Sequence, residues 1–168
     1  ERRKECENHG AMSLLAAQTD FSEPGELGRF IDESEVSLLE AQMAGKGYLT
    51  AAQMAGAFQM LRSYDLLWSR LVNSYLLGER RPMNDLMAWN ADTTRMPATM
   101  HSQYLRHLFL DNDLSSGRFP VNGKPVALSD IDLPVFVVGT VTDHVAPWRS
   151  VYKLHFLTDT EITFVLAS

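Results

Sequence analysis

An aspartate followed by a histidine, Asp143 and His144, is the pair of residues in this sequence whose position best suits chemistry. The pair follows Gly139, which ends the apolar run 134–138. A continuous run of β-branched and aromatic residues is expected of a central strand in a parallel sheet. Functional groups of open α/β sheets collect in loops beyond the carboxyl ends of such strands. Asp143 is therefore a candidate for the acid that orients a catalytic histidine.

A purely structural role for Asp143 has equal weight from spacing alone. Pro147 is placed to begin a helix, and a loop carboxylate before a helix can cap it or accept hydrogen bonds from backbone amides. His144 adjoins the acid, but adjacent residues on an extended loop point apart. We therefore expect His144 to make a structural hydrogen bond rather than to pair with Asp143.

The other nucleophilic and metal-binding side chains are poorly placed for chemistry. Cys6 is the only cysteine, so an internal disulfide is excluded, and it lies between two glutamates that disfavour a thiolate. His101 and His107 are six residues apart, a spacing that does not bring them together on one helix. We therefore expect no metal site.

Helical periodicity fills the region between the first apolar run and the acid. Asp32 with Glu35 and Thr50 with Gln53 each have the spacing of a capping box, the signal that begins a helix. The sequence predicts four helices here: from Asp32 through Met43, from Thr50 through Leu61, roughly 64–77, and a fourth carrying Met100, Tyr104, Leu108 and Phe109.

Short apolar runs on both sides of this helical region predict strands, near 13–17 before it and at 134–138 and 161–166 after it. Asn122 and Gly123 supply the turn of a small hairpin over 119–126. The order of strand, acid loop, helix and strand at the end of the chain predicts a crossover unit of a parallel sheet. The predicted fold class is α/β.

Composition limits the possible partners. The 15 Lys and Arg residues against 21 Asp and Glu residues give a net charge of -6, which lacks the basic excess that nucleic-acid binding needs. No apolar run approaches the roughly 20 residues of a membrane-spanning helix, and no signal peptide is evident. We expect a cytoplasmic protein.

Five stretches of the chain resemble polyhydroxyalkanoate synthases of the class I type. They span almost everything from 13 to 168, and their order and spacing together are specific. The stretches are LLAAQTDF at 14–21, DLMAWNAD at 85–92, YLR at 104–106, LDNDL at 110–114 and DHVAPW at 143–148.

The resemblance implies a partial α/β-hydrolase fold, strands six to eight of a mostly parallel sheet, with an inserted helical cap. Residues 1–20 would hold the end of the elbow helix and strand six, and 21–115 the cap. Residues 116–168 would hold a core hairpin, strand seven, the acid loop, a helix and strand eight. Strand six would then lack the neighbour that carries the nucleophile, and such an open sheet edge favours association.

The resemblance also implies an activity, the polymerisation of (R)-3-hydroxyacyl-CoA into polyhydroxyalkanoate with release of CoA. In that family a cysteine attacks the thioester, a histidine is its base, and an aspartate, which Asp143 matches, orients the histidine. Cys6 lies outside any Gly-x-Cys-x-Gly turn, and none of the five histidines follows the last predicted strand. We therefore expect a fragment of a longer enzyme, inactive alone.

Further residues and partners follow from the same resemblance. Trp89 and Asn90 match a pair near the active-site entrance and the dimer contact, although packing beneath the cap is an equal reading for Trp89. Tyr104 and His101, close to one face of the same helix, are candidates for lining the acyl channel, with core packing as the alternative for Tyr104. His144 is a further candidate for the substrate channel or the dimer contact. The family implies a homodimer through the cap, a polyester granule surface, and no cofactor beyond the CoA that the substrate carries.

Two other functions stay open. One is an α/β-hydrolase esterase or polyester depolymerase with a similar acid loop, which would have a serine in place of the cysteine at the elbow. The other is an interaction module without a catalytic triad, in which the cap mediates dimerisation.

Overall fold

The computed structural model describes residues 10–54, 68, 71–78, 85, 88 and 95–168. The chain divides into two compact units, one formed by Glu1–Val36 with Gln103–Ser168 and the other by Ser37–Ser102. The second unit is thus inserted in the sequence of the first. Cys6, Trp89 and Asn90 lie outside the described residues.

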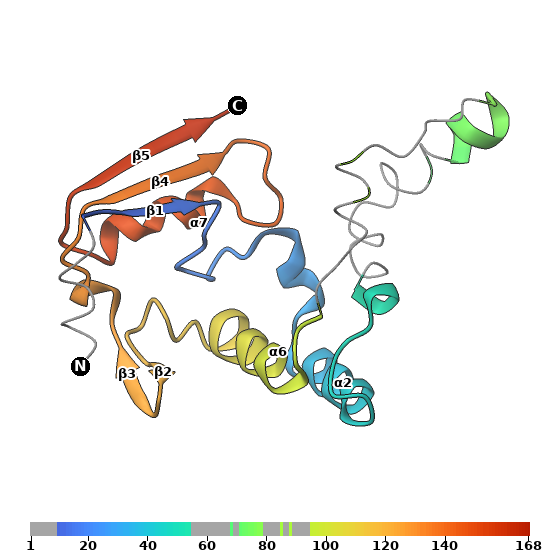
Figure 1. Ribbon diagram of the computed structural model, residues 1–168, viewed down its shortest axis with the longest axis horizontal. Coiled ribbons are helices and arrows are strands. Elements are labelled where there is room, and N and C mark those ends of the chain that lie inside the picture. The colour runs from blue at the N-terminus through green and yellow to red at the C-terminus, as the bar shows by residue number, and fades with distance from the viewer. Residues whose placement is uncertain (1–9, 55–67, 69–70, 79–84, 86–87, 89–94) are drawn as a thin grey trace. The chain divides into compact units, whose positions relative to one another are not determined.

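A three-stranded parallel sheet is the centre of the first unit (Figure 1). Strands β1 (Met12–Leu15), β4 (Val135–Thr140) and β5 (Ile162–Ala167) lie in the order β1-β4-β5. Both pairings are parallel, so the fold is of the α/β class with β4 as the central strand. The three predicted strands are confirmed, and β4 continues through Gly139 and Thr140, beyond the predicted run.

One face of this sheet is covered by the helix that follows the acid loop. Helix α7 (Trp148–Tyr152) continues into the 3-10 segment η6 (Lys153–Phe156), as the proline at position 147 predicts. Burial of apolar side chains on this face stabilises the fold by about 25 cal/mol per Å² removed from water. The buried core side chains are Val135, Val137, Ala146, Val151 and Leu154.

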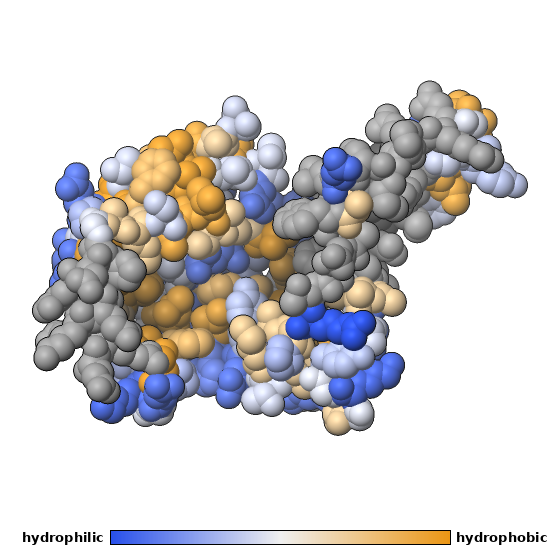
Figure 2. Space-filling view, viewed as in Figure 1, coloured by the Kyte–Doolittle hydropathy of each residue, from blue (hydrophilic) through white to orange (hydrophobic). Residues whose placement is uncertain are grey.

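The opposite face of the sheet is apolar and open among the described residues. Leu15 is 73% exposed, Phe136 41% and Val165 39%. Pairing places Leu15 beside Val138, and Val138 beside Val165, so these side chains form a row across the sheet. Figure 2 shows apolar side chains gathered over the region of the strands. Parallel sheets are ordinarily covered on both faces, and an open apolar face of this kind favours association.

A small hairpin and two 3-10 segments complete the first unit. Strands β2 (Phe119–Val121) and β3 (Lys124–Val126) pair antiparallel, which confirms the predicted hairpin. Asn122 and Gly123 have φ angles of 52° and 73°, the left-handed values that its two-residue turn requires. The 3-10 segments are η1 (Gly25–Phe30) and η5 (Leu128–Asp130).

The predicted caps begin helices in the structure. Helix α2 (Glu33–Ala44) begins where the Asp32 carboxylate accepts hydrogen bonds from the backbone N–H groups of Ser34 and Glu35. The Thr50 amide donates to Gln53 Oε1 at 3.1 Å and the Gln53 amide to Thr50 Oγ1 at 3.4 Å, a reciprocal capping box.

The remaining described helices are short. The fourth predicted helix consists of α6 (Ala98–Tyr104) followed directly by the π-helical segment η4 (Leu105–Leu110). The predicted helix over 64–77 is described near its end, where it contains the π-helical segment η3 (Val72–Leu76). Within the described residues, no helix is long and apolar enough to cross a membrane.

Replacing Gly139 by alanine should destabilise the first unit. A Cβ at this buried position would lie 3.1 Å from Phe164 Cζ and 3.2 Å from Trp148 Cβ, so the strand and α7 would have to move apart. We expect a loss of about 1–3 kcal/mol in the free energy of unfolding, measured by urea denaturation. Gly45→Ala, where a Cβ meets nothing within 4 Å, is the control and should change stability far less.

Replacing Leu15 by lysine should reduce association of the chain. The open apolar face should cause self-association that rises with concentration, and a charge in its exposed row opposes that contact. Light scattering on a sizing column measures the mass at several concentrations. Leu38→Lys, at an exposed side chain of α2, is the matched control. Equal masses for the unchanged protein and both variants at every concentration would show that this face does not drive association.

Candidate functional site

The acid loop begins where the central strand ends, and its shape depends on Asp143. The Asp143 Oδ1 atom accepts hydrogen bonds from the backbone N–H groups of Val145 at 2.8 Å and Ala146 at 2.9 Å. These two bonds close a tight turn, so the carboxylate is fixed relative to the backbone around it. The described residues provide no hydrogen-bond partner for Oδ2, which leaves that oxygen as an acceptor for another group.

Asp143 does not cap helix α7. The residue before the helix is Pro147, which makes no side-chain cap, and the two amides that Asp143 binds precede the first helical residue. The structural role of Asp143 is therefore to close the loop. This role uses Oδ1 and leaves Oδ2 able to orient a histidine.

His144 holds the loop through its backbone rather than through its ring. Its carbonyl oxygen accepts a hydrogen bond from the Glu26 amide at 3.2 Å. Among the described residues the imidazole has no hydrogen-bond partner. The structural hydrogen bond expected of the His144 side chain is therefore not found among the described residues, and the main chain makes the contact instead.

The helix behind the acid loop is tied to the segment that follows β1. The fully buried Ser150 hydroxyl donates to the carbonyl oxygen of Asp20 and accepts from Gln18 Nε2 at 3.2 Å. Lys153 Nζ lies 2.9 Å from a Glu23 carboxylate oxygen and 3.4 Å from Asp20 Oδ1. These bonds join two stretches more than a hundred residues apart in sequence.

The charges in this network reinforce one another. Partial burial raises the pKa of Asp20, but hydrogen bonds from Ser22 and the nearby Lys153 charge outweigh it and lower the pKa overall. The hydrogen bond to Glu23 is the main reason that the pKa of Lys153 is raised, with the charge of Asp20 adding to it against desolvation. Both shifts favour the ionised pair.

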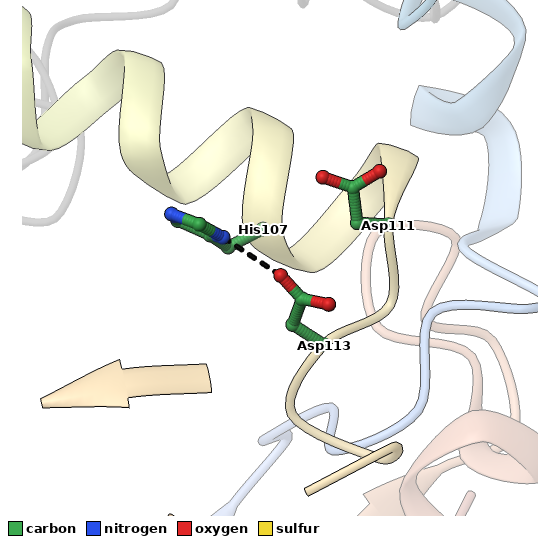
Figure 3. A group of neighbouring side chains, drawn as sticks. All are labelled: His107, Asp111 and Asp113. Carbon is green, nitrogen blue, oxygen red and sulfur yellow. Dashed lines mark hydrogen bonds and ion pairs between the residues drawn. The ribbon is translucent and has the colours of Figure 1, made fainter. Parts of the chain in front are cut away.

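A second polar cluster brings together His107, Asp111 and Asp113, whose ligand atoms lie within 4.8 Å of one another (Figure 3). His107 Nδ1 lies 2.7 Å from Asp113 Oδ2, and Arg118 Nε donates to Asp113 Oδ1 at 2.9 Å. Both oxygens of Asp113 are therefore engaged, one of them by a permanent cation. In this structure Asp113 is thus the centre of an ion-pair and hydrogen-bond network.

Backbone bonds show what the second cluster holds in place. The Asp113 amide donates to the His107 carbonyl, and the Asp113 carbonyl accepts from the amides of Arg118 and Phe119. Asp113 thus joins the end of the π-helical segment to the first strand of the hairpin. The hydrogen bond from His107 is the main reason that the pKa of Asp113 is lowered, and Arg118 adds to this against partial desolvation.

The channel candidates have different surroundings. Tyr104 is 39% exposed, its ring centroid lies 5.8 Å from that of Phe109, and burial raises its pKa. His101 is buried, its Nδ1 has no partner among the described residues, and burial lowers its pKa. The channel role of Tyr104 stays a prediction.

Sequence reasoning missed the groups that support the acid loop. Ser150 and Lys153 bind the segment after β1, and Gly25 lies against the backbone of the loop. In the sequence, nothing beyond the glycine itself indicates the positive φ of Gly25. The spacing of Ser150 and Lys153 places both on one helical face, which is the only clue that the sequence offers.

The fold and this geometry define a class of protein: an α/β protein with a carboxylate in the loop beyond the carboxyl end of a central parallel strand. No protein-family model matches the chain. Curated proteins match the chain over 94% of its length.

The similar proteins are all poly(3-hydroxyalkanoate) polymerases. The polymerase subunit PhaC of Rhizobium meliloti and the polymerase of Methylorubrum extorquens are each 42% identical over 157 residues. The subunit of Cupriavidus necator is 36% identical over 164 residues. The chain spans 26% of the length of the first two and 28% of the third. The chain belongs to the poly(3-hydroxyalkanoate) polymerase family. It corresponds to a region of about a quarter of the length of these relatives.

Replacing Asp113 by asparagine should destabilise the protein near neutral pH. The lowered pKa means that the fold favours the ionised carboxylate. This contribution is fully present above the ordinary carboxyl pKa and is lost as pH falls through the lowered value. We expect a cost of about 2 kcal/mol at about pH 7, and a smaller difference from the unchanged protein at about pH 3.

Urea unfolding at both pH values measures this difference. Asp111→Asn is the matched control, because Asp111 is an exposed carboxylate two residues away. A destabilisation by Asp113→Asn that is the same at both pH values would contradict a contribution from the charge.

Proposed function

We propose that this chain supplies the acid, Asp143, of a Cys-His-Asp active site in a polyester synthase that polymerises (R)-3-hydroxyacyl-CoA. The observation that carries the proposal is the Asp143 carboxylate itself. One of its oxygens is held by two backbone amides and the other has no partner among the described residues. The names of the relatives, which are polymerases of poly(3-hydroxyalkanoate), supply the reaction class.

In the proposed reaction a cysteine thiolate, outside the residues of this chain, attacks the thioester carbonyl. The acyl group passes to the cysteine and CoA leaves as the thiol, with its proton supplied by the histidine. The hydroxyl of another acyl group then attacks the enzyme thioester, and the histidine takes the hydroxyl proton. Asp143 would fix the tautomer of the histidine and stabilise the imidazolium. No cofactor is needed beyond the CoA that the substrate brings.

The proposed setting is a partial α/β-hydrolase fold. Strands β1, β4 and β5 would be strands six, seven and eight of its sheet, and residues 21–115 would be the helical cap. Support comes from the parallel pairing and from the position of the acid loop between β4 and β5. The acyltransferase would be an intracellular homodimer joined through the cap and working at the surface of polyester granules.

The residues named from the resemblance keep their proposed places in this scheme. Trp89 and Asn90 would lie near the active-site entrance and the dimer contact, and Tyr104 would line the acyl channel. His144 would lie at the substrate channel or the dimer contact, with its backbone carbonyl holding the acid loop. This chain by itself would release no CoA, because the cysteine and the histidine come from elsewhere in the polymerase.

Activity is tested in a chimera in which this chain replaces the matched region of the Rhizobium meliloti polymerase. With 3-hydroxybutyryl-CoA as substrate, release of free CoA thiol measures turnover. We expect Asp143→Asn to lower kcat by at least about a hundredfold, because the amide disfavours the correct tautomer and cannot stabilise the imidazolium. Asp130→Asn, at an exposed carboxylate in η5, is the control and should leave kcat unchanged.

Different outcomes separate the proposal from its rivals. An active chimera that tolerates Asp143→Asn would contradict the catalytic role. A chimera that hydrolyses polyester or esters and forms no polymer would favour a depolymerase. Tight association with no turnover would favour an interaction module.

A further inference from the structure

The acid loop is braced from one side by residues 18–26, which follow β1 and end with the first two residues of the 3-10 segment η1; we call this segment the brace. Gly25 has a φ of 74°, and an added Cβ would lie 2.5 Å from the His144 carbonyl oxygen and 3.0 Å from Pro147 Cγ. No side chain fits there unless the loop moves. The contact is made to backbone next to Asp143, which cannot swing away as a side chain could.

A hydrogen bond joins the brace to the same carbonyl group. The Glu26 amide donates to the His144 oxygen at 3.2 Å. His144 lies inside the turn that Asp143 closes onto the amides of Val145 and Ala146. A displacement of the His144 carbonyl therefore changes the direction in which the second carboxylate oxygen of Asp143 points.

The other end of the brace is anchored to the helix that leaves the loop. Ser150 binds the Asp20 carbonyl and Gln18, and Lys153 binds the carboxylates of Asp20 and Glu23. The brace thus contacts the acid loop at the His144 carbonyl and helix α7 with its 3-10 extension at Ser150 and Lys153. A segment held at both places can fix the loop against the helix.

We propose that Gly25 and Glu26 are positioning residues for the Asp143 carboxylate, acting through the His144 carbonyl. The proposal rests on the proposed function, since it assigns a role in orienting the catalytic acid. Misplacement of a catalytic group by about 1 Å can cost about a hundredfold in rate. The effect should fall on kcat, with KM little changed, because the brace acts on the acid rather than on substrate binding.

The first experiment needs no activity and uses the chain itself. NMR hydrogen exchange of the Val145 and Ala146 amides reports whether the Asp143 turn is closed. In Gly25→Ala we expect both amides to exchange at least about tenfold faster. Gly47→Ala is the matched control, because Gly47 has a φ of 77° but a Cβ there meets nothing within 4 Å. It carries the same backbone strain without the contact, and should leave both amides unchanged.

A second variant keeps the test decisive if Gly25→Ala does not fold. Ser150→Ala removes the hydroxyl that anchors the brace and adds no atom. We expect a smaller increase in exchange at the same two amides. A folded Gly25→Ala, or failing that a folded Ser150→Ala, with unchanged exchange at Val145 and Ala146 would overturn the proposal.

Kinetics in the chimera complete the test. Gly25→Ala should lower kcat by about tenfold to a hundredfold with KM little changed, and Ser150→Ala by less. If Asp143→Asn abolishes turnover but the folded brace variants keep the full kcat, the positioning role fails and the catalytic role stands. If Asp143→Asn is fully active while Gly25→Ala still opens the turn, the brace is real as structure, the proposed function fails, and the positioning role fails with it.

Discussion

The parallel pairing of β4 with a strand on each side is the constraint on which the site depends. The ladder continues past the strand, because the Ala16 amide donates to the Val138 carbonyl and the Val141 amide to the Ala167 carbonyl. Since α7 also packs against the buried face of the sheet, the carboxyl end of β4 has little freedom. Asp143 follows two residues after this last ladder bond. The acid therefore takes its position from backbone pairing, and only its final orientation depends on the loop.

The orientation of the Asp143 carboxylate is restricted both by its own hydrogen bonds inside the loop and by contacts from outside the loop. A loop of this length, left to itself, would sample many conformations, and fixing each residue costs about 1–2 kcal/mol of conformational entropy. The two hydrogen bonds to Asp143 Oδ1 offset part of that cost inside the turn. The Gly25 contact and the Glu26 bond restrict it from outside. A structural and a catalytic role, which the sequence leaves as alternatives, thus require different atoms of the same side chain and do not exclude each other.

Features set by neighbours in sequence could be predicted from the sequence. The capping residues Asp32 and Thr50 act on amides within three positions, and the turn at Asn122 depends on the φ preferences of two residues. The strand at 134–138 was evident because its run is β-branched and aromatic, whereas the run at 13–17 could also have been a turn of core helix and was identified as a strand from its neighbours. The brace could not be found in this way. Gly25 and His144 are separated by more than a hundred residues, and no local pattern encodes a contact of that kind.

The stretches that resemble the polymerase family divide into two kinds when their contacts are considered. In 110–114, Asn112 has a φ of 49° and its Oδ1 accepts the Phe21 amide at 2.9 Å, while Asp113 is saturated by His107 and Arg118. The side-chain oxygens of Asn112 and Asp113 are thus used to join chain segments. In 143–148, by contrast, one carboxylate oxygen of Asp143 has no partner among the described residues after the loop is closed. The resemblance includes both stretches equally, but an acceptor that is held in place and has no partner in the described part of the chain is what a histidine would need. The chemistry of this chain is therefore best sought at Asp143.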